Sequence, residues 1–89
     1  MNFPFNQEKF DDHIIRTFSK DVDIDELKWH FDNENRKVTI LEGLDWEFQM
    51  DDDLPVKLKV GDVINIPKGT YHRIKRGSTD LKIKIQFYE

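Results

Sequence analysis

The feature that most constrains the fold is an alternation of apolar and polar residues with a period of two. Such alternation is typical of strands that bury one face. The alternating runs are short, and turn-forming Gly, Pro, Asn and Asp residues bound each of them. They cover residues 27–31, 37–40, 46–50, 56–60 and 81–87. Short strands at regular spacing predict an all-β sandwich or barrel, and they argue against an alternating βαβ architecture.

The first 25 residues depart from this pattern. Phe10, Ile14 and Ile15 are spaced as on one face of a helix, which predicts one or two amphipathic helical turns within residues 7–15. We therefore expect residues 1–25 to form an N-terminal extension with a short helical turn that packs on a barrel. Residues 26–89 are expected to form the barrel itself.

The chain has 89 residues and no cysteine. This length predicts a single domain with a thin core. The absence of cysteine excludes disulfides, zinc fingers, iron–sulfur ligation and thiol nucleophiles. The remaining ways to reinforce so small a domain are a closed sheet, a bound metal or ligand, or self-association.

The net charge of −4 is spread unevenly, because residues 1–53 sum to −9 and residues 54–89 to +5. An acidic balance argues against nucleic-acid binding. The split predicts that basic strands pair with acidic strands in one sheet, and a dimer or partner interface is the alternative. No signal-peptide pattern and no apolar run of about 20 residues is present, so we expect a cytoplasmic protein that does not enter a membrane.

A more specific pattern lies in residues 61–72, which read GDVINIPKGTYH. Gly61 permits a tight turn into a strand, Pro67 ends that strand, and Gly69 turns the next corner. His72 then begins the following strand. This pattern resembles the second sequence motif of the cupin superfamily, with Arg76 at the position of its final asparagine.

The first cupin motif has a weaker counterpart in residues 29–43. When the two are aligned on Gly43, His30 takes the first histidine position, Asp32 takes the second, and Arg36 replaces the glutamate. The resemblance covers about residues 26–88. It implies a small cupin-type jelly-roll β-barrel, often a homodimer, with its site in the barrel mouth. Cupins include dioxygenases, isomerases, sugar-binding modules and storage proteins, so the fold alone assigns no function.

Three residues of these motifs form a candidate metal site. His30 and Asp32 share one face of a predicted strand, about 7 Å apart, and His72 completes the set. Two imidazoles and one carboxylate are the ligand set favoured by non-haem Fe(II). Mn(II), Ni(II) and Zn(II) are the alternative ions for such a site.

Arg36 leaves the interpretation open, since its charge opposes a metal ion nearby. It either contacts an anionic ligand that lies over the metal or replaces it, or pairs with Asp32 in a metal-free pocket, or belongs to a barrel with a structural role only. Strand parity adds Arg76 and Gln49 to Arg36 as candidate substrate-binding residues. With a metal, we expect an oxygenase or isomerase acting on a small acid or sugar. Without one, we expect a small-molecule-binding or structural dimer module.

Overall fold

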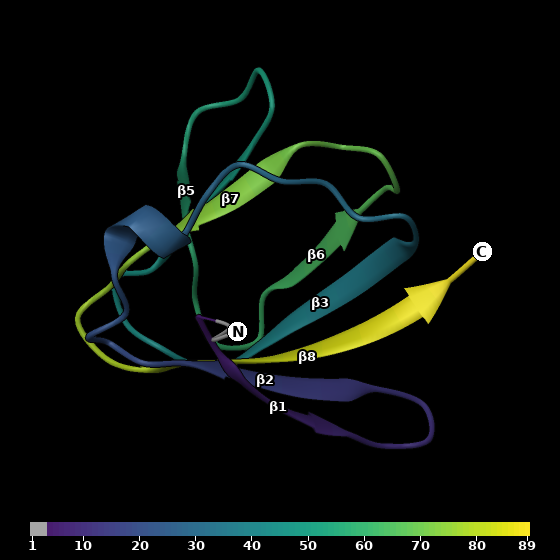
Figure 1. Ribbon diagram of the computed structural model, residues 1–89, viewed down its shortest axis with the longest axis horizontal. Helices are drawn as coiled ribbons and strands as arrows, with labels where there is room; N and C mark the ends of the chain where they lie inside the picture. The colour runs from purple at the N-terminus through teal and green to yellow at the C-terminus, as the bar shows by residue number, and fades with distance from the viewer. Residues whose placement is uncertain (1–3) are drawn as a thin grey trace.

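The computed structural model describes residues 4–89, and within this range the chain is built almost entirely from β-strands (Figure 1). This confirms the predicted all-β class. The elements are β1 (Asn6–Lys9), β2 (Ile14–Phe18), the 3-10 turn η1 (Ile24–Glu26), β3 (Asn35–Glu42), β4 (Glu47–Met50), β5 (Val56–Lys57), β6 (Val63–Ile66), β7 (His72–Lys75) and β8 (Leu81–Tyr88).

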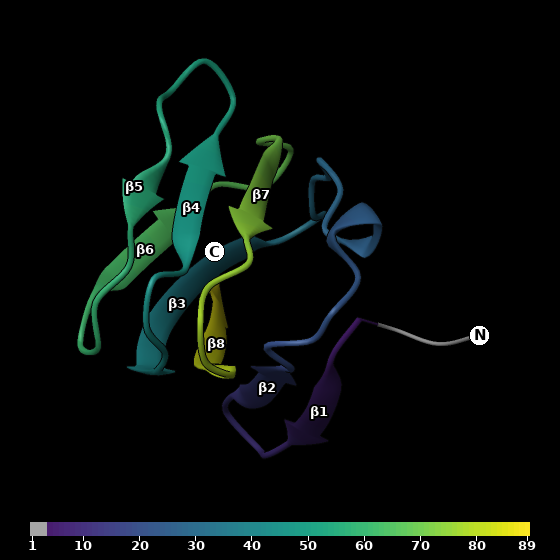
Figure 2. The ribbon, with the colours of Figure 1, turned by 90° about the vertical axis from the view of Figure 1, so that its left-hand side faces the viewer.

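The strands form two antiparallel sheets. The larger sheet has the order β1-β2-β8-β3-β6, and the smaller has the order β5-β4-β7. Figure 2 shows the smaller sheet lying over β6, β3 and β8 of the larger one. Strands that are distant in the sequence are therefore neighbours, as in the pairing of β2 and β3 with β8. The predicted jelly-roll arrangement is confirmed.

The core lies between the two sheets. Alternate residues of β3 and β8 point into it, and the register places Val38 opposite Ile85 and Ile40 opposite Ile83. Each buried aliphatic side chain stabilises the fold by about 1.5–3 kcal/mol. Trp46 is fully buried, and its indole Nε1 donates a hydrogen bond of 2.6 Å to the carbonyl of Thr79. This bond satisfies the indole's one donor.

The helical turn predicted within residues 7–15 is wrong in position. Those residues belong to the β1–β2 hairpin, and the helical turn of the N-terminal region is η1. In β2 the side chains of Ile14, Arg16 and Phe18 lie on one face, and the strand pairs along its whole length with β8. This pairing satisfies the backbone of a segment that would otherwise be a marginal isolated helix. The domain boundary at residue 25 stays a prediction, although residues on both sides of it share the larger sheet.

The strand predicted for residues 27–31 is also wrong. Only His30 pairs there, in an isolated bridge with His72. The side chains of Trp29 and Phe31 point outward and are 40% and 46% exposed, and the Phe31 ring lies edge-on to Tyr71 at 5.1 Å. These aromatic side chains therefore lie on the outside of the molecule, whereas Leu27, Lys28 and His30 border the space between the two sheets.

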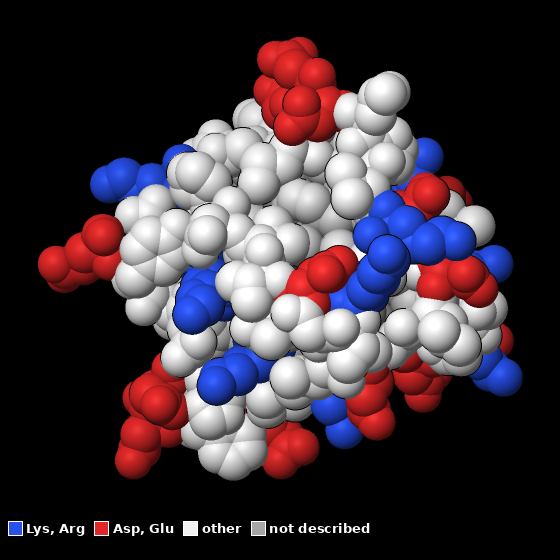
Figure 3. Space-filling view, turned by 180° about the vertical axis from the view of Figure 1, so that it is seen from behind, with Lys and Arg blue, Asp and Glu red and all other residues white. Residues whose placement is uncertain are grey.

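Charged side chains of both signs lie next to one another on part of the surface (Figure 3). Among residues 4–89, two lysine–carboxylate ion pairs join the acidic half of the chain to the basic half. They are Lys57–Asp45 at 3.4 Å and Lys82–Glu42 at 3.2 Å, as the charge split predicted. Among the described residues, no helix has the length and apolar character to cross a bilayer.

Candidate metal and ligand site

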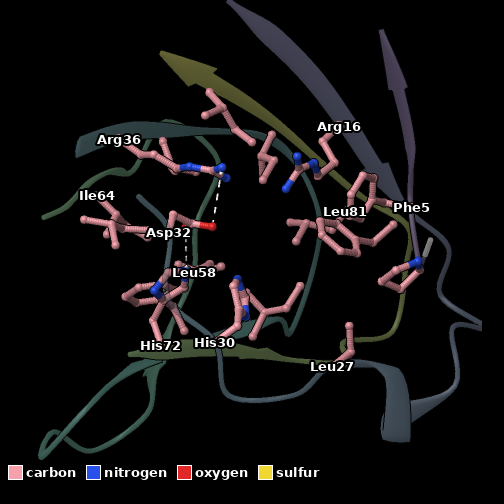
Figure 4. A pocket seen from close by; sticks show the side chains of 18 of the residues that line it. Phe5, Arg16, Leu27, His30, Asp32, Arg36, Leu58, Ile64, His72 and Leu81 are labelled. Carbon is pink, nitrogen blue, oxygen red and sulfur yellow. Dashed lines mark ion pairs between the residues drawn. The ribbon is translucent and has the colours of Figure 1, made fainter. Parts of the chain in front are cut away.

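A cavity of about 280 Å³ lies between the two sheets, at the small end of the size range of ligand pockets. Its walls are mostly apolar, with Leu58 and Ile64 on one side and Phe5 and Leu81 on the other (Figure 4). Five polar side chains that Figure 4 labels also line it: Arg16, His30, Asp32, Arg36 and His72. An apolar cavity with a few convergent polar groups is the usual form of a small-molecule site.

The backbone holds His30 and His72 side by side. Each amide donates to the other residue's carbonyl, at 3.1 Å from His30 and 2.8 Å from His72, and the two ring centroids are 4.3 Å apart. His72 is 5% exposed and stacks on Phe48 at 5.8 Å, whereas His30 is exposed. One imidazole is therefore fixed in the interior and the other stands at the mouth of the cavity.

Both imidazoles present the same nitrogen to the site. Nδ1 of His30 bonds the carbonyl of Lys28 at 3.0 Å, and Nδ1 of His72 bonds the carbonyl of Thr70 at 2.8 Å. Because a carbonyl only accepts, each Nδ1 must carry the hydrogen, so Nε2 of the neutral ring carries the lone pair. A backbone carbonyl on the second ring nitrogen is the usual support of a metal-binding histidine.

Asp32 completes the cluster. Its Oδ2 lies 3.3 Å from Nε2 of His72, its Oδ1 lies 3.4 Å from Nη2 of Arg36, and its carbonyl accepts from the amide of Gly69 at 2.8 Å. Burial raises the pKa of Asp32, but the His72 ring and the positive charge of Arg36 outweigh burial and lower that pKa below its ordinary value. The carboxylate is therefore charged at neutral pH.

The cluster leaves one buried carboxylate oxygen without a hydrogen-bond partner among the described residues. This oxygen is Oδ2 of Asp32, and it faces the Nε2 lone pair that the neutral His72 presents. Two acceptors at 3.3 Å require a metal ion between them or a proton on the ring. The ligand atoms of His30, Asp32 and His72 all lie within 4.8 Å of one another, so the three residues fit a divalent ion.

Arg36 forms the predicted ion pair with Asp32, and it also pairs with a residue that the sequence analysis did not single out. Its Nε and Nη2 donate to Oε1 of Glu34 at 3.1 and 2.7 Å. An uncompensated guanidinium about 5 Å from a divalent ion would cost roughly 7 kcal/mol at an effective dielectric of 20. Because Glu34 compensates the charge of Arg36, the electrostatic repulsion between Arg36 and a bound metal ion is much smaller than the sequence alone predicted.

Two predicted substrate-binding residues lie outside the cavity. Phe48 lines the cavity, and the neighbouring Gln49 points to the opposite face of the strand. The Gln49 side chain accepts from Nε of Arg73 and donates to the carbonyl of Asp53, at 3.0 Å each. Arg76 follows the end of β7, so strand parity no longer applies to it, and its Nη1 donates to the carbonyl of Val22 at 3.0 Å. Of the three predicted substrate contacts, Arg36 alone lines the cavity.

Arg16 is a cavity residue that the sequence analysis missed. It lies between Ile14 and Phe18 on the inward face of β2. A charged residue on an apolar face is a detectable signal, but the predicted helical turn ended at residue 15 and no strand face was assigned to Arg16. Burial and the nearby charge of Arg36 lower the pKa of Arg16 to about 10, so the guanidinium is still charged at neutral pH.

No protein-family model and no curated protein matches the chain. Solved structures do match it. DMSP lyase DddQ from Ruegeria pomeroyi has a TM-score of 0.72 at 17% identity, over 97% of this chain and 47% of the lyase. An RmlC-like cupin with a double-stranded β-helix fold from Methanocaldococcus jannaschii has a TM-score of 0.68 at 16% identity, over 97% of this chain and 82% of that protein.

The Fe(II) form of HppE is also similar, with a TM-score of 0.65 at 17% identity over 85% of this chain. This chain spans 41% of HppE and 47% of the lyase, which is less than half of either enzyme. Structural similarity at such identities establishes the architecture. The protein therefore has the double-stranded β-helix fold of the cupins.

Proposed function

We propose that this protein binds a divalent metal ion through His30, Asp32 and His72 and takes a small polar or anionic molecule into the adjoining cavity. The observation that carries the proposal is that ligand atoms of His30, Asp32 and His72 lie within 4.8 Å of one another, while the buried Oδ2 of Asp32 lacks a hydrogen-bond partner among the described residues. Buried polar atoms are normally satisfied, and a cation would satisfy this one.

The ligand set favours Fe(II), since two histidines and one carboxylate leave coordination positions free for substrate. Mn(II), Ni(II) and Zn(II) are accepted by similar donors. HppE, which has the same fold, was solved in an Fe(II) form. Once bound, such an ion would supply Lewis-acid or redox chemistry, and the activity that we propose is an oxygenase or isomerase acting on a small acid or sugar.

The protein's own residues have separate roles in this proposal. His72 and Asp32 form the fixed, buried part of the site, and His30 closes it at the mouth. Arg36 holds Oδ1 of Asp32 at 3.4 Å, which turns Oδ2 toward His72. The apolar walls exclude water from the ligand and strengthen its electrostatic contacts.

A metal-free binding module without catalytic activity is the second candidate. It is favoured by the contacts of Asp32 with Arg36 at 3.4 Å and His72 at 3.3 Å. A proton on Nε2 of His72 would turn these contacts into a continuous network of opposite charges. Whether the protein forms a homodimer, and whether it is located in the cytoplasm, both stay predictions from the sequence.

Metal titration separates the two candidates. We expect protein freed of metal by chelation to bind one equivalent of Fe(II) under anaerobic conditions, with a rise in melting temperature, because an ion that binds only the folded state stabilises it by about 2.7 kcal/mol at 100 times its dissociation constant. His30→Ala and His72→Ala should each weaken binding at least ten-fold. Calorimetry and thermal unfolding measure both effects.

His13→Ala is the matched control, because His13 pairs with Asp12 away from the cavity and its loss should leave the metal affinity unchanged. His30 is exposed, so the His30→Ala variant should fold even if His72→Ala does not. The metal proposal fails if no stoichiometric ion binds, or if the three variants bind it equally. The metal-free module would then be the better account.

A further inference from the structure

Of the positive side chains that line the cavity, Arg16 and Lys28 form no ion pair within the described chain, and Lys28 is exposed. None of the ion pairs within residues 4–89 involves Arg16. Its Nε and Nη2 donate to Oε1 of Gln7 at 3.0 and 2.6 Å, and its Cζ lies 3.9 Å from the centroid of the Phe5 ring. Both partners are uncharged, so the guanidinium keeps its full charge inside a largely apolar cavity.

The position of Arg16 suits a ligand that reaches across the cavity. Arg16 belongs to β2 of the larger sheet and His72 to β7 of the smaller one. Figure 4 shows the guanidinium pointing into the cavity on the side away from His72, with the apolar side chains of the walls around it. A molecule held at Arg16 would place its other end near His30, Asp32 and His72.

We propose that Arg16 anchors the carboxylate of a small ligand with a short apolar body. A guanidinium in an apolar environment binds a carboxylate through charge-assisted hydrogen bonds and is suited to planar, bidentate contact. Charge compensation favours a monoanion, because Arg36 is already paired with Glu34 and Asp32, and the opposite charges of Lys28 and Glu26, which also line the cavity, cancel. The inference rests on the proposed ligand cavity, and it does not depend on which metal binds, or on whether one does.

The test compares butyrate with butyramide, its uncharged analogue, in NMR titrations of the chelated and the metal-loaded protein. We expect butyrate to shift signals of the cavity residues and to bind at least ten-fold more tightly than butyramide. Arg16→Gln should lower butyrate affinity at least ten-fold and leave butyramide affinity unchanged. Arg16→Lys should retain part of the preference for butyrate over butyramide, because lysine keeps the positive charge but lacks the two parallel N–H donors of the guanidinium.

Arg73→Gln is the matched control. Arg73 also contacts an aromatic ring, with Cζ 4.6 Å from the Trp29 centroid, and its Nε also donates to a glutamine, Gln49, at 3.0 Å. It lies outside the cavity, so this variant should bind butyrate as the wild type does. Arg16→Gln should also leave the affinity for Fe(II) within two-fold, which separates loss of the anchor from loss of the metal site.

Three results would overturn the carboxylate assignment. In the first, butyrate and butyramide bind equally. In the second, Arg16→Gln and Arg73→Gln have the same effect. In the third, inorganic phosphate, mainly a dianion above pH 7, binds more tightly than butyrate and depends on Arg16, which would assign the site to phosphoryl groups. Failure to bind Fe(II) while butyrate binding depends on Arg16 would refute the metal site and leave the anchor intact.

Discussion

Gly77→Ala should lower the free energy of unfolding by about 3 kcal/mol or more. A Cβ built at residue 77 would lie 2.6 Å from the amide nitrogen of Trp46, and still closer to the carbonyl of Leu44 and to Cδ1 of the indole. Two of these three atoms belong to the backbone, and Trp46 is fully buried, so the clash is relieved only by moving the backbone or the core. Urea unfolding followed by tryptophan fluorescence would measure the loss.

Gly69→Ala is the control for this prediction. Gly69 has a φ of +77° and open space around its Cβ position, so alanine there costs only the strain of the left-handed conformation, about 1–2 kcal/mol. Gly77 does not have a positive φ, so its substitution reports the close packing, whereas the substitution of Gly69 reports the backbone preference. Equal unfolding midpoints for both variants would contradict the packing explanation.

Arg36→Glu should have the opposite effects on the metal-free and the metal-loaded protein. Without metal, the new carboxylate joins Glu34 and Asp32 and repels both, so the melting temperature should fall. With metal, a negative charge replaces a positive one about 5 Å from a divalent ion, which should tighten metal binding at least 100-fold. The free energy that corresponds to this factor is only a fraction of the unscreened Coulomb energy of the exchange. Calorimetry with Mn(II), together with thermal unfolding with and without the ion, measures both changes.

Lys37→Glu provides the same change in charge on the adjacent residue. Lys37 is exposed and does not line the cavity, so its effect on metal affinity should be small and should vanish at high salt. If Arg36→Glu behaves like Lys37→Glu, then Arg36 does not act electrostatically on the cluster. If Arg36→Glu leaves the metal-free protein as stable as the wild type, the ion pairs of Arg36 contribute nothing to folding.

The parts of the fold that could be predicted from the sequence are those in which local pattern and long-range pairing agree. Alternation located β3, β4 and β8 to within a few residues, because both their buried faces and their turns are encoded locally. It failed for β1 and β2, since in so short a segment the spacing of Phe10, Ile14 and Ile15 fits a helix as well as a strand. The deciding interaction is the pairing with β8, at the other end of the chain.

The candidate site was predictable to a similar extent. The motifs identified His30, Asp32 and His72, and the structure brings these three together. They could not reveal that Glu34 compensates Arg36, because this depends on how the turn before β3 directs two side chains. Gly77 shows the same limit. A glycine beside a turn predicts backbone freedom, whereas here the missing side chain makes room for Trp46.

The isolated bridge between His30 and His72 has a consequence for chain entropy. Residues 27–34 lie outside the sheets, and they reach β7 through this bridge rather than through a strand. An ion shared by both imidazoles would close a long loop of chain, as a disulfide does, in a protein without cysteine. Because the ion would bind only the folded state, it would hold this loop closed only while the protein is folded. Unlike a covalent cross-link, this metal link would be removed by a chelator. The metal concentration would therefore determine how stably residues 27–34 are attached to the barrel.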